Sequence, residues 1–82
     1  MKTAEQIREQ TEYHQAQINW LESALKSEIA RLQGDAQYAS ENPMPYDFTY
    51  HLGDHARKIE QTKTMIHDHM KAIELLEWVL AE

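Results

Sequence analysis

The feature that most constrains this fold is a pair of long segments in which apolar residues recur every three or four positions. Such spacing places apolar side chains along one face of an α-helix. The segments cover residues 3–33 and 47–81, and residues 34–46 connect them. Pro43 and Pro45 in the connector lack the amide hydrogen that a helix requires, so they predict a break. The sequence therefore predicts an all-α protein, a single long antiparallel helical hairpin with a connector that contains proline and tyrosine.

The first helix is predicted to begin at Thr3, because Thr3 and Gln6 have the spacing of a capping box. Gly34 follows the segment, and glycine commonly lies just beyond a helix end. These features predict a helix that ends at Gln33. The apolar stripe expected to face the second helix is Ile7, Thr11, His14, Ile18, Leu21, Leu25, Ile29 and Leu32, with one local irregularity in its spacing.

The start of the second helix has two interpretations. Asp47 can cap a helix that begins at Phe48, which places Gly53 in the interior at a cost of up to about 1 kcal/mol. Alternatively, Asp54 caps a shorter helix. The unbroken stripe from Phe48 favours the earlier start. That stripe is Phe48, Leu52, Ala56, Ile59, Thr62, Ile66, Met70, Ile73, Leu76 and Leu80.

Further apolar surface lies outside these two stripes. On the first helix, small residues flank a tryptophan at helical spacing, which allows another helix to approach closely. The C-terminal part of the second helix is apolar nearly all round, and one partner helix cannot cover such a surface. We expect two hairpins to form a homodimeric, coiled-coil-like four-helix bundle; the alternative is a surface reserved for a different protein. The candidate interface residues are Ala16, Trp20, Ser23, Ser27, Ala30, Leu75, Trp78 and Val79.

Composition excludes several classes of protein. The 82 residues include no cysteine, so this small scaffold has no disulfides, and self-association or a metal remains as a stabilising device. The net charge of −6 and the scattered basic residues argue against direct nucleic-acid binding. No apolar run is long enough to span a bilayer and no signal peptide is recognisable. We therefore expect a soluble, cytoplasmic protein.

Histidines are the candidate metal ligands. Asp47, His51 and His55 share helical spacing and form a weak candidate site for a divalent ion, because a functional site needs further ligands and supporting hydrogen bonds. The alternative is that these side chains are simply solvated, and no cofactor is predicted. His14 lies within the inner stripe of the first helix. It is interpreted as a hydrogen-bonded core histidine or, alternatively, as a pH-sensitive joint.

The connector region concentrates aromatic side chains around its prolines. These rings either cover the end of the hairpin or meet a partner protein. Phe48 and Tyr50 adjoin the second helix and are expected to cover the hairpin end. Met44 and Tyr46 are expected at the exposed tip, as candidates for partner contact.

No catalytic constellation is recognisable. The serines have no histidine and acid at a meaningful spacing, and no glycine-rich phosphate loop occurs, so an enzyme is not expected. The sequence favours a non-enzymatic protein-interaction module that binds and occludes or bridges a larger protein complex. Small regulators and inhibitors, including phage and mobile-element accessory proteins, have this character. The alternatives are a histidine-dependent metal-binding or pH-responsive regulator and a purely structural homo-oligomeric subunit.

Overall fold

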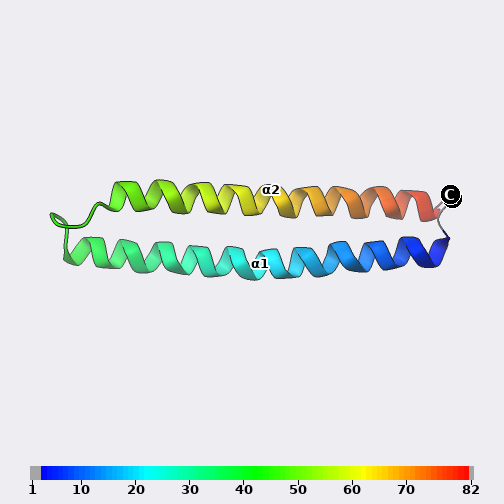
Figure 1. Cartoon of the computed structure of the whole chain (residues 1–82), viewed down its shortest axis with the longest axis horizontal. Coiled ribbons are helices and arrows are strands. Elements are labelled where there is room, and N and C mark those ends of the chain that lie inside the picture. Colours follow the sequence, from blue (N-terminus) through cyan, green and yellow to red (C-terminus); the bar gives the residue numbers. More distant parts are fainter. Residues whose placement is uncertain (1–2, 82) are drawn as a thin grey trace.

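The protein is a hairpin of two long antiparallel helices (Figure 1). The computed structural model describes residues 3–81. Helix α1 covers Ala4–Glu41 and helix α2 covers Phe48–Ala81, and the molecule measures 61 × 15 × 14 Å. The all-α hairpin predicted from the sequence is thus confirmed. Within the described range, no helix combines the length and the apolar character that crossing a membrane requires.

The two helix starts follow the predicted capping chemistry. The Thr3 side chain accepts a hydrogen bond from the Gln6 backbone N–H at 3.2 Å, and the Thr3 N–H donates to Gln6 Oε1 at 2.9 Å. The Tyr50 N–H donates to Asp47 Oδ1 at 3.2 Å, so Asp47 caps α2. Gly53 therefore lies inside α2, which confirms the earlier of the two predicted starts.

The predicted end of α1 at Gln33 was wrong. The helix continues through Gly34 to Glu41, and Asn42 closes it by donating its backbone N–H to the Tyr38 carbonyl at 2.9 Å. No glycine in the described chain has a positive φ, so Gly34 adopts ordinary helical geometry. The helix persists because the residues beyond Gly34 still face α2, and it ends just before the prolines. The connector thus shrinks from residues 34–46 to 42–47, a usual length for a helix–helix loop.

The two helices meet along a continuous line of buried and half-buried side chains, which we call the seam. The α1 seam positions repeat with the alternating steps of four and three residues that characterise coiled coils. They are Ile7, Thr11, His14, Ile18, Leu21, Leu25, Glu28, Leu32, Asp35 and Ala39. Facing them on α2 are Phe48, His51, His55, Ile59, Thr62, Ile66, His69, Ile73 and Leu76.

Five apolar residues expected in the seam are exposed, and the prediction of their burial was wrong. They are Ile29, Leu52, Ala56, Met70 and Leu80. For the first four, the preceding polar residue takes the inner position, namely Glu28, His51, His55 and His69. Glu28 is 9% exposed whereas Ile29 is 40% exposed, because α1 keeps a regular seven-residue repeat instead of the irregularity that Ile29 required. Most of these polar groups find hydrogen-bond partners across the seam, which makes their burial tolerable.

The apolar core is consequently small. Among the described residues, the buried apolar side chains are Ile7, Ile18 and Leu21, and no large side chain is fully enclosed. Many large apolar side chains remain at the surface. The seam is thus partly polar, while many apolar side chains are exposed and available for functional contacts.

Candidate interaction surfaces

A buried histidine links the two helices near the loop end of the hairpin. His55 Nδ1 contacts Glu28 Oε2, and His55 Nε2 contacts Asp35 Oδ2 at 2.5 Å. Both ring nitrogens can donate only when the imidazole carries two protons. The His55 ring is therefore a cation held between the carboxylates of Glu28 and Asp35. We call these three residues the His55 centre.

Proton affinities in the His55 centre follow from these contacts. Hydrogen bonds to Asp35 and Glu28 raise the pKa of His55, against the opposing effect of burial. The hydrogen bond from His55 lowers the pKa of Asp35, and a hydrogen bond from the Tyr46 hydroxyl acts in the same direction. The Arg31 guanidinium approaches Glu28 at 3.9 Å from the solvent side. The centre is therefore most favourable when the ring is charged and the carboxylates are ionised.

The candidate metal residues Asp47, His51 and His55 do not converge on one point. The Asp47 carboxylate caps α2, and the His51 ring stacks on Tyr46 with a centroid distance of 4.8 Å. His55 is engaged at both nitrogens by α1. Among residues 3–81, no group of three or more histidine, aspartate or glutamate side chains is arranged to hold a metal ion.

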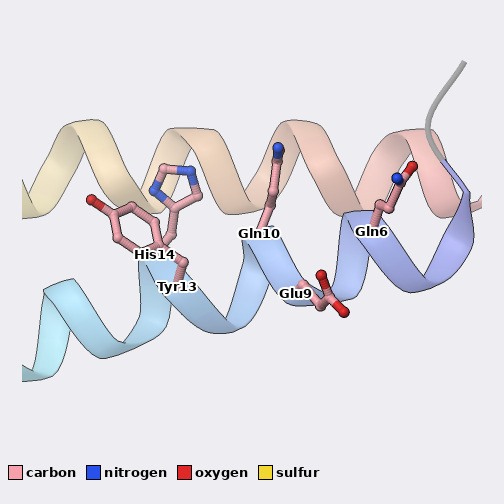
Figure 2. Close-up of a pocket in the computed structure, with 5 residues that line it drawn as sticks. All are labelled: Gln6, Glu9, Gln10, Tyr13 and His14. Atoms are coloured by element: carbon pink, nitrogen blue, oxygen red, sulfur yellow. The ribbon is translucent and has the colours of Figure 1, made fainter.

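A second pair of histidines spans the seam near the open end of the hairpin. His14 Nδ1 lies 2.7 Å from His69 Nδ1, so one ring donates a hydrogen bond and the other accepts it. The Tyr13 ring packs edge-on against both, with centroid distances of 5.3 Å to His14 and 6.4 Å to His69. Figure 2 shows Tyr13 beside His14 on α1. The interpretation of His14 as a hydrogen-bonded histidine of the inner stripe is thus confirmed.

The outer face of α1 carries the predicted small residues around Trp20. Trp20 is 66% exposed, and Ala16, Ser23, Ser27 and Ala30 are exposed beside it. Part of this face forms one side of an open groove whose other side is α2. The α1 residues of the groove are Trp20, Ser23, Ala24, Ser27, Glu28 and Arg31, and the α2 residues are Lys58, Gln61, Thr62 and Met65.

Two more apolar surfaces lie at the ends of the molecule. Near the C-terminus of α2, Leu75 and Trp78 are 63% and 60% exposed, and Val79 is exposed beside them. At the loop, Met44 is 92% exposed. Tyr46 is half-buried between Tyr38 and His51, with its centroid 4.9 Å from that of Tyr38.

The exposure of Tyr46 and Tyr50 differs from the sequence-based prediction. Tyr46 is expected at the exposed tip from the sequence, yet it is half-buried and packs against Tyr38. Tyr50 was expected to cover the hairpin end, yet it is 72% exposed. The difference arises because α1 extends to Glu41, which brings Tyr38 alongside Tyr46 at the loop.

Glu28, Asp35 and His69 were not recognised as interacting residues from the sequence. The available signal was their spacing: Glu28 and Asp35 follow Leu21 at seven-residue intervals, and His69 follows Thr62 in the same way.

Comparison with known proteins assigns the chain to no family. No protein-family model, curated protein or solved structure matches the chain.

Proposed function

We propose that the protein is a non-enzymatic interaction module that uses exposed apolar helical surface to bind another protein and thereby occlude or bridge a larger complex. The observation that carries this proposal is the solvent-accessible area of the chain. The chain exposes 6402 Å². A compact protein of 9.7 kDa exposes about 5,100 Å². The excess of roughly 1,300 Å² exceeds the ~800 Å² that each partner contributes to a standard interface.

Two different surfaces support two kinds of contact. The small-residue face around Trp20 suits the close approach of another helix, and we assign it to homodimerisation into a four-helix bundle. The C-terminal surface of Leu75, Trp78 and Val79 lies at one end of a 61 Å rod. We assign this end to the foreign protein, together with Met44 at the opposite end as a second contact for bridging.

The charge of the chain indicates the chemistry of the foreign protein. The net charge is −6, and Glu74 and Glu77 flank the exposed Leu75 and Trp78. An apolar contact flanked by two carboxylates is complementary to an apolar patch with basic residues beside it. Complementary charge accelerates encounter and suppresses wrong partners. The partner is therefore a protein with a basic, partly apolar surface.

A comparative pull-down tests the proposal. Purified tagged protein is incubated with lysate of its native host, alongside the Leu75→Ser/Trp78→Ser variant and an Ile29→Ser control. Ile29 is exposed and apolar but lies away from the C-terminal surface. We expect a defined partner to be retained by the unmodified protein and the control and lost with the double variant, while helix content by circular dichroism stays the same. Identical capture by all three proteins would contradict the assignment of this surface.

A second candidate function, response to pH, is favoured by the histidines of the seam. His14, His55 and His69 all lie between the helices and bond across them. Histidine changes its charge near physiological pH, so each of these contacts depends on protonation. In this alternative, a change of pH alters hairpin stability and thereby the presentation of the binding surface.

A further inference from the structure

One exposed row of α1 positions carries large rings in its first half and very small residues in its second half. Tyr13, Trp20, Ser27 and Gly34 follow each other at seven-residue intervals, so they lie on one face of α1. All four are exposed, and Trp20 and Ser27 line the groove beside α2. A row of this kind is complementary to itself when it is reversed, because each ring then meets a small residue.

Gly34 has no role inside the single chain that requires glycine. It lies in the interior of α1, where glycine disfavours the helix. Its backbone has ordinary helical geometry, and a Cβ atom added to it would meet nothing within 4 Å. An element outside the chain that approaches this point closely provides the missing reason for a glycine.

We propose, building on the self-association proposed above, that two copies of the chain pair antiparallel along this row. Trp20 of each copy packs against Ser27 of the second copy, and Tyr13 packs against Gly34. The two-fold axis that relates the copies crosses α1 near Ala24. Each ring enters the space left by a small residue, as in knobs-into-holes packing, and the interface is isologous. The groove beside α2 receives the second α1, which gives a four-helix bundle.

The charge pattern favours a second copy as the occupant of this surface, and the exposed area is sufficient for it. The excess surface of the hairpin is larger than the share that one partner contributes to a standard interface. The four residues of the row are uncharged, as are Ser23 and Ala24 next to the axis. Two chains of net charge −6 can therefore meet along this row without placing carboxylates against each other.

A swap of two side chains tests the antiparallel register. Trp20→Ser removes the ring, and Ser27→Trp opposes ring to ring, so each single variant is expected to weaken the dimer roughly tenfold or more in sedimentation equilibrium. The double variant Trp20→Ser/Ser27→Trp again places each ring opposite a serine. We expect it to restore the dimer to within about threefold of the original dissociation constant. A double variant as weak as the worse single variant would overturn the proposed register.

Disulfide trapping gives an independent measurement, because the chain has no cysteine of its own. Ala24→Cys places two thiols near the axis and is expected to form a cross-linked dimer on mild oxidation. Ala30→Cys is the matched control on the same helix. Antiparallel pairing holds its two thiols too far apart to join. Equal cross-linking of both variants would overturn the register, since parallel copies align each residue with itself.

The outcomes also separate this inference from the function on which it rests. If the unmodified chain is a monomer at micromolar concentration, the proposed homodimerisation fails and the register fails with it. The chain could instead be a dimer that the swap does not restore and that Ala24→Cys does not cross-link. In that case the register alone is overturned, and the copies associate through a different surface. Rescue by the swap together with selective trapping at Ala24 supports both.

Discussion

Two polar contacts between the helices, which we call joints, both contain histidine but require different protonation states. Near the loop, His55 is a cation held by Glu28 and Asp35 from α1. Near the open end, His14 and His69 share one hydrogen bond between like nitrogens. The first joint requires a doubly protonated ring, whereas the second fails if both rings carry two protons. The surroundings of a histidine, rather than its identity, thus decide whether a proton stabilises or breaks the helix pair.

Between the joints lies an apolar stretch of the seam with Ile18 and Leu21 at its centre, and Ile7 is buried beyond the His14–His69 joint. The two polar contacts, separated by apolar packing, fix the alignment of the helices, because sliding one helix would separate the histidines from their partners. We infer that the joints give specificity to a hairpin whose apolar core is small. Buried ionic groups contribute in this way in some proteins, although they often add little stability.

The largest expected effect comes from breaking the His55 centre. His55→Leu leaves Glu28 buried opposite an apolar side chain, and an unpaired buried carboxylate is strongly unfavourable. We expect the melting temperature at pH 6 to fall by roughly 10 °C or more, measured by circular dichroism at fixed protein concentration. His67→Leu, at an exposed position of the same helix, is the control and is expected to change little. Equal changes of melting temperature in the two variants would show that the His55 centre contributes no more to stability than an exposed position.

A rescue experiment sharpens this prediction. Replacing all three members of the His55 centre, as Glu28→Leu/Asp35→Leu/His55→Leu, removes the charges together and fills the seam with apolar groups. Such replacement of a buried ion group is often neutral or stabilising. The triple variant is therefore expected to melt at or above the temperature of the unmodified protein. A triple variant less stable than His55→Leu alone would show that the ionic contacts themselves supply the stability.

The pH dependence of stability is the next largest effect. The pKa of His55 is raised in the folded chain, so its contribution is complete below the ordinary value of about 6.5 and is lost as pH rises through the raised value. The pKa of Asp35 is lowered, so its contribution persists to acid pH and is lost only as pH falls through the lowered value. We expect the melting temperature to fall from pH 6 to pH 9, and His55→Gln to remove most of that slope. An identical slope in the variant would assign it to other groups.

The His14–His69 joint is expected to contribute less than the His55 centre. The variant His14→Leu/His69→Leu replaces one hydrogen bond across the seam with apolar contact, and no buried charge is left without a partner. We expect its melting temperature at pH 7 to differ from that of the unmodified protein by only a few degrees. A fall as large as that of His55→Leu would show that the two joints contribute equally to stability.

Sequence reasoning was successful where the determining contacts are local. The Thr3–Gln6 capping box, the Asp47 cap and the break at the prolines all depend on residues close together in the chain, and the structure contains each of them. The end of α1 was missed because a glycine was interpreted as a stop, although the seven-residue repeat continues to Ala39. An exposed glycine in a long helix carries a small local penalty that contact with a second helix overcomes.

The polar joints could not be predicted because they depend on contacts between distant residues. Choosing Glu28 instead of Ile29 for the seam requires knowing that His55 lies opposite, and that depends on the alignment of the helices. An apolar pattern considered one helix at a time therefore favours Ile29. The same reasoning kept His14 in the inner stripe but did not identify His69 as its partner.

The smallest expected effect connects the loop to the His55 centre. The Tyr46 hydroxyl helps to lower the pKa of Asp35, while the Tyr46 ring stacks on His51 and packs against Tyr38. Tyr46→Phe removes the hydroxyl and keeps the ring. Because the hydroxyl contributes to the lowered pKa of Asp35, we expect that pKa to move back toward 3.8 when the Asp35 carboxyl of the variant is titrated by NMR.

The matched control for this last prediction is Tyr50→Phe, because Tyr50 is exposed and lies on the same loop side of α2. It is expected to leave the titration of Asp35 unchanged. The melting temperature of Tyr46→Phe should fall by only a few degrees, since His55 still holds Asp35 from the seam. A fall as large as that of His55→Leu would instead make the loop a main support of the His55 centre. The contrast between the two histidine joints would then depend on the loop as much as on the seam.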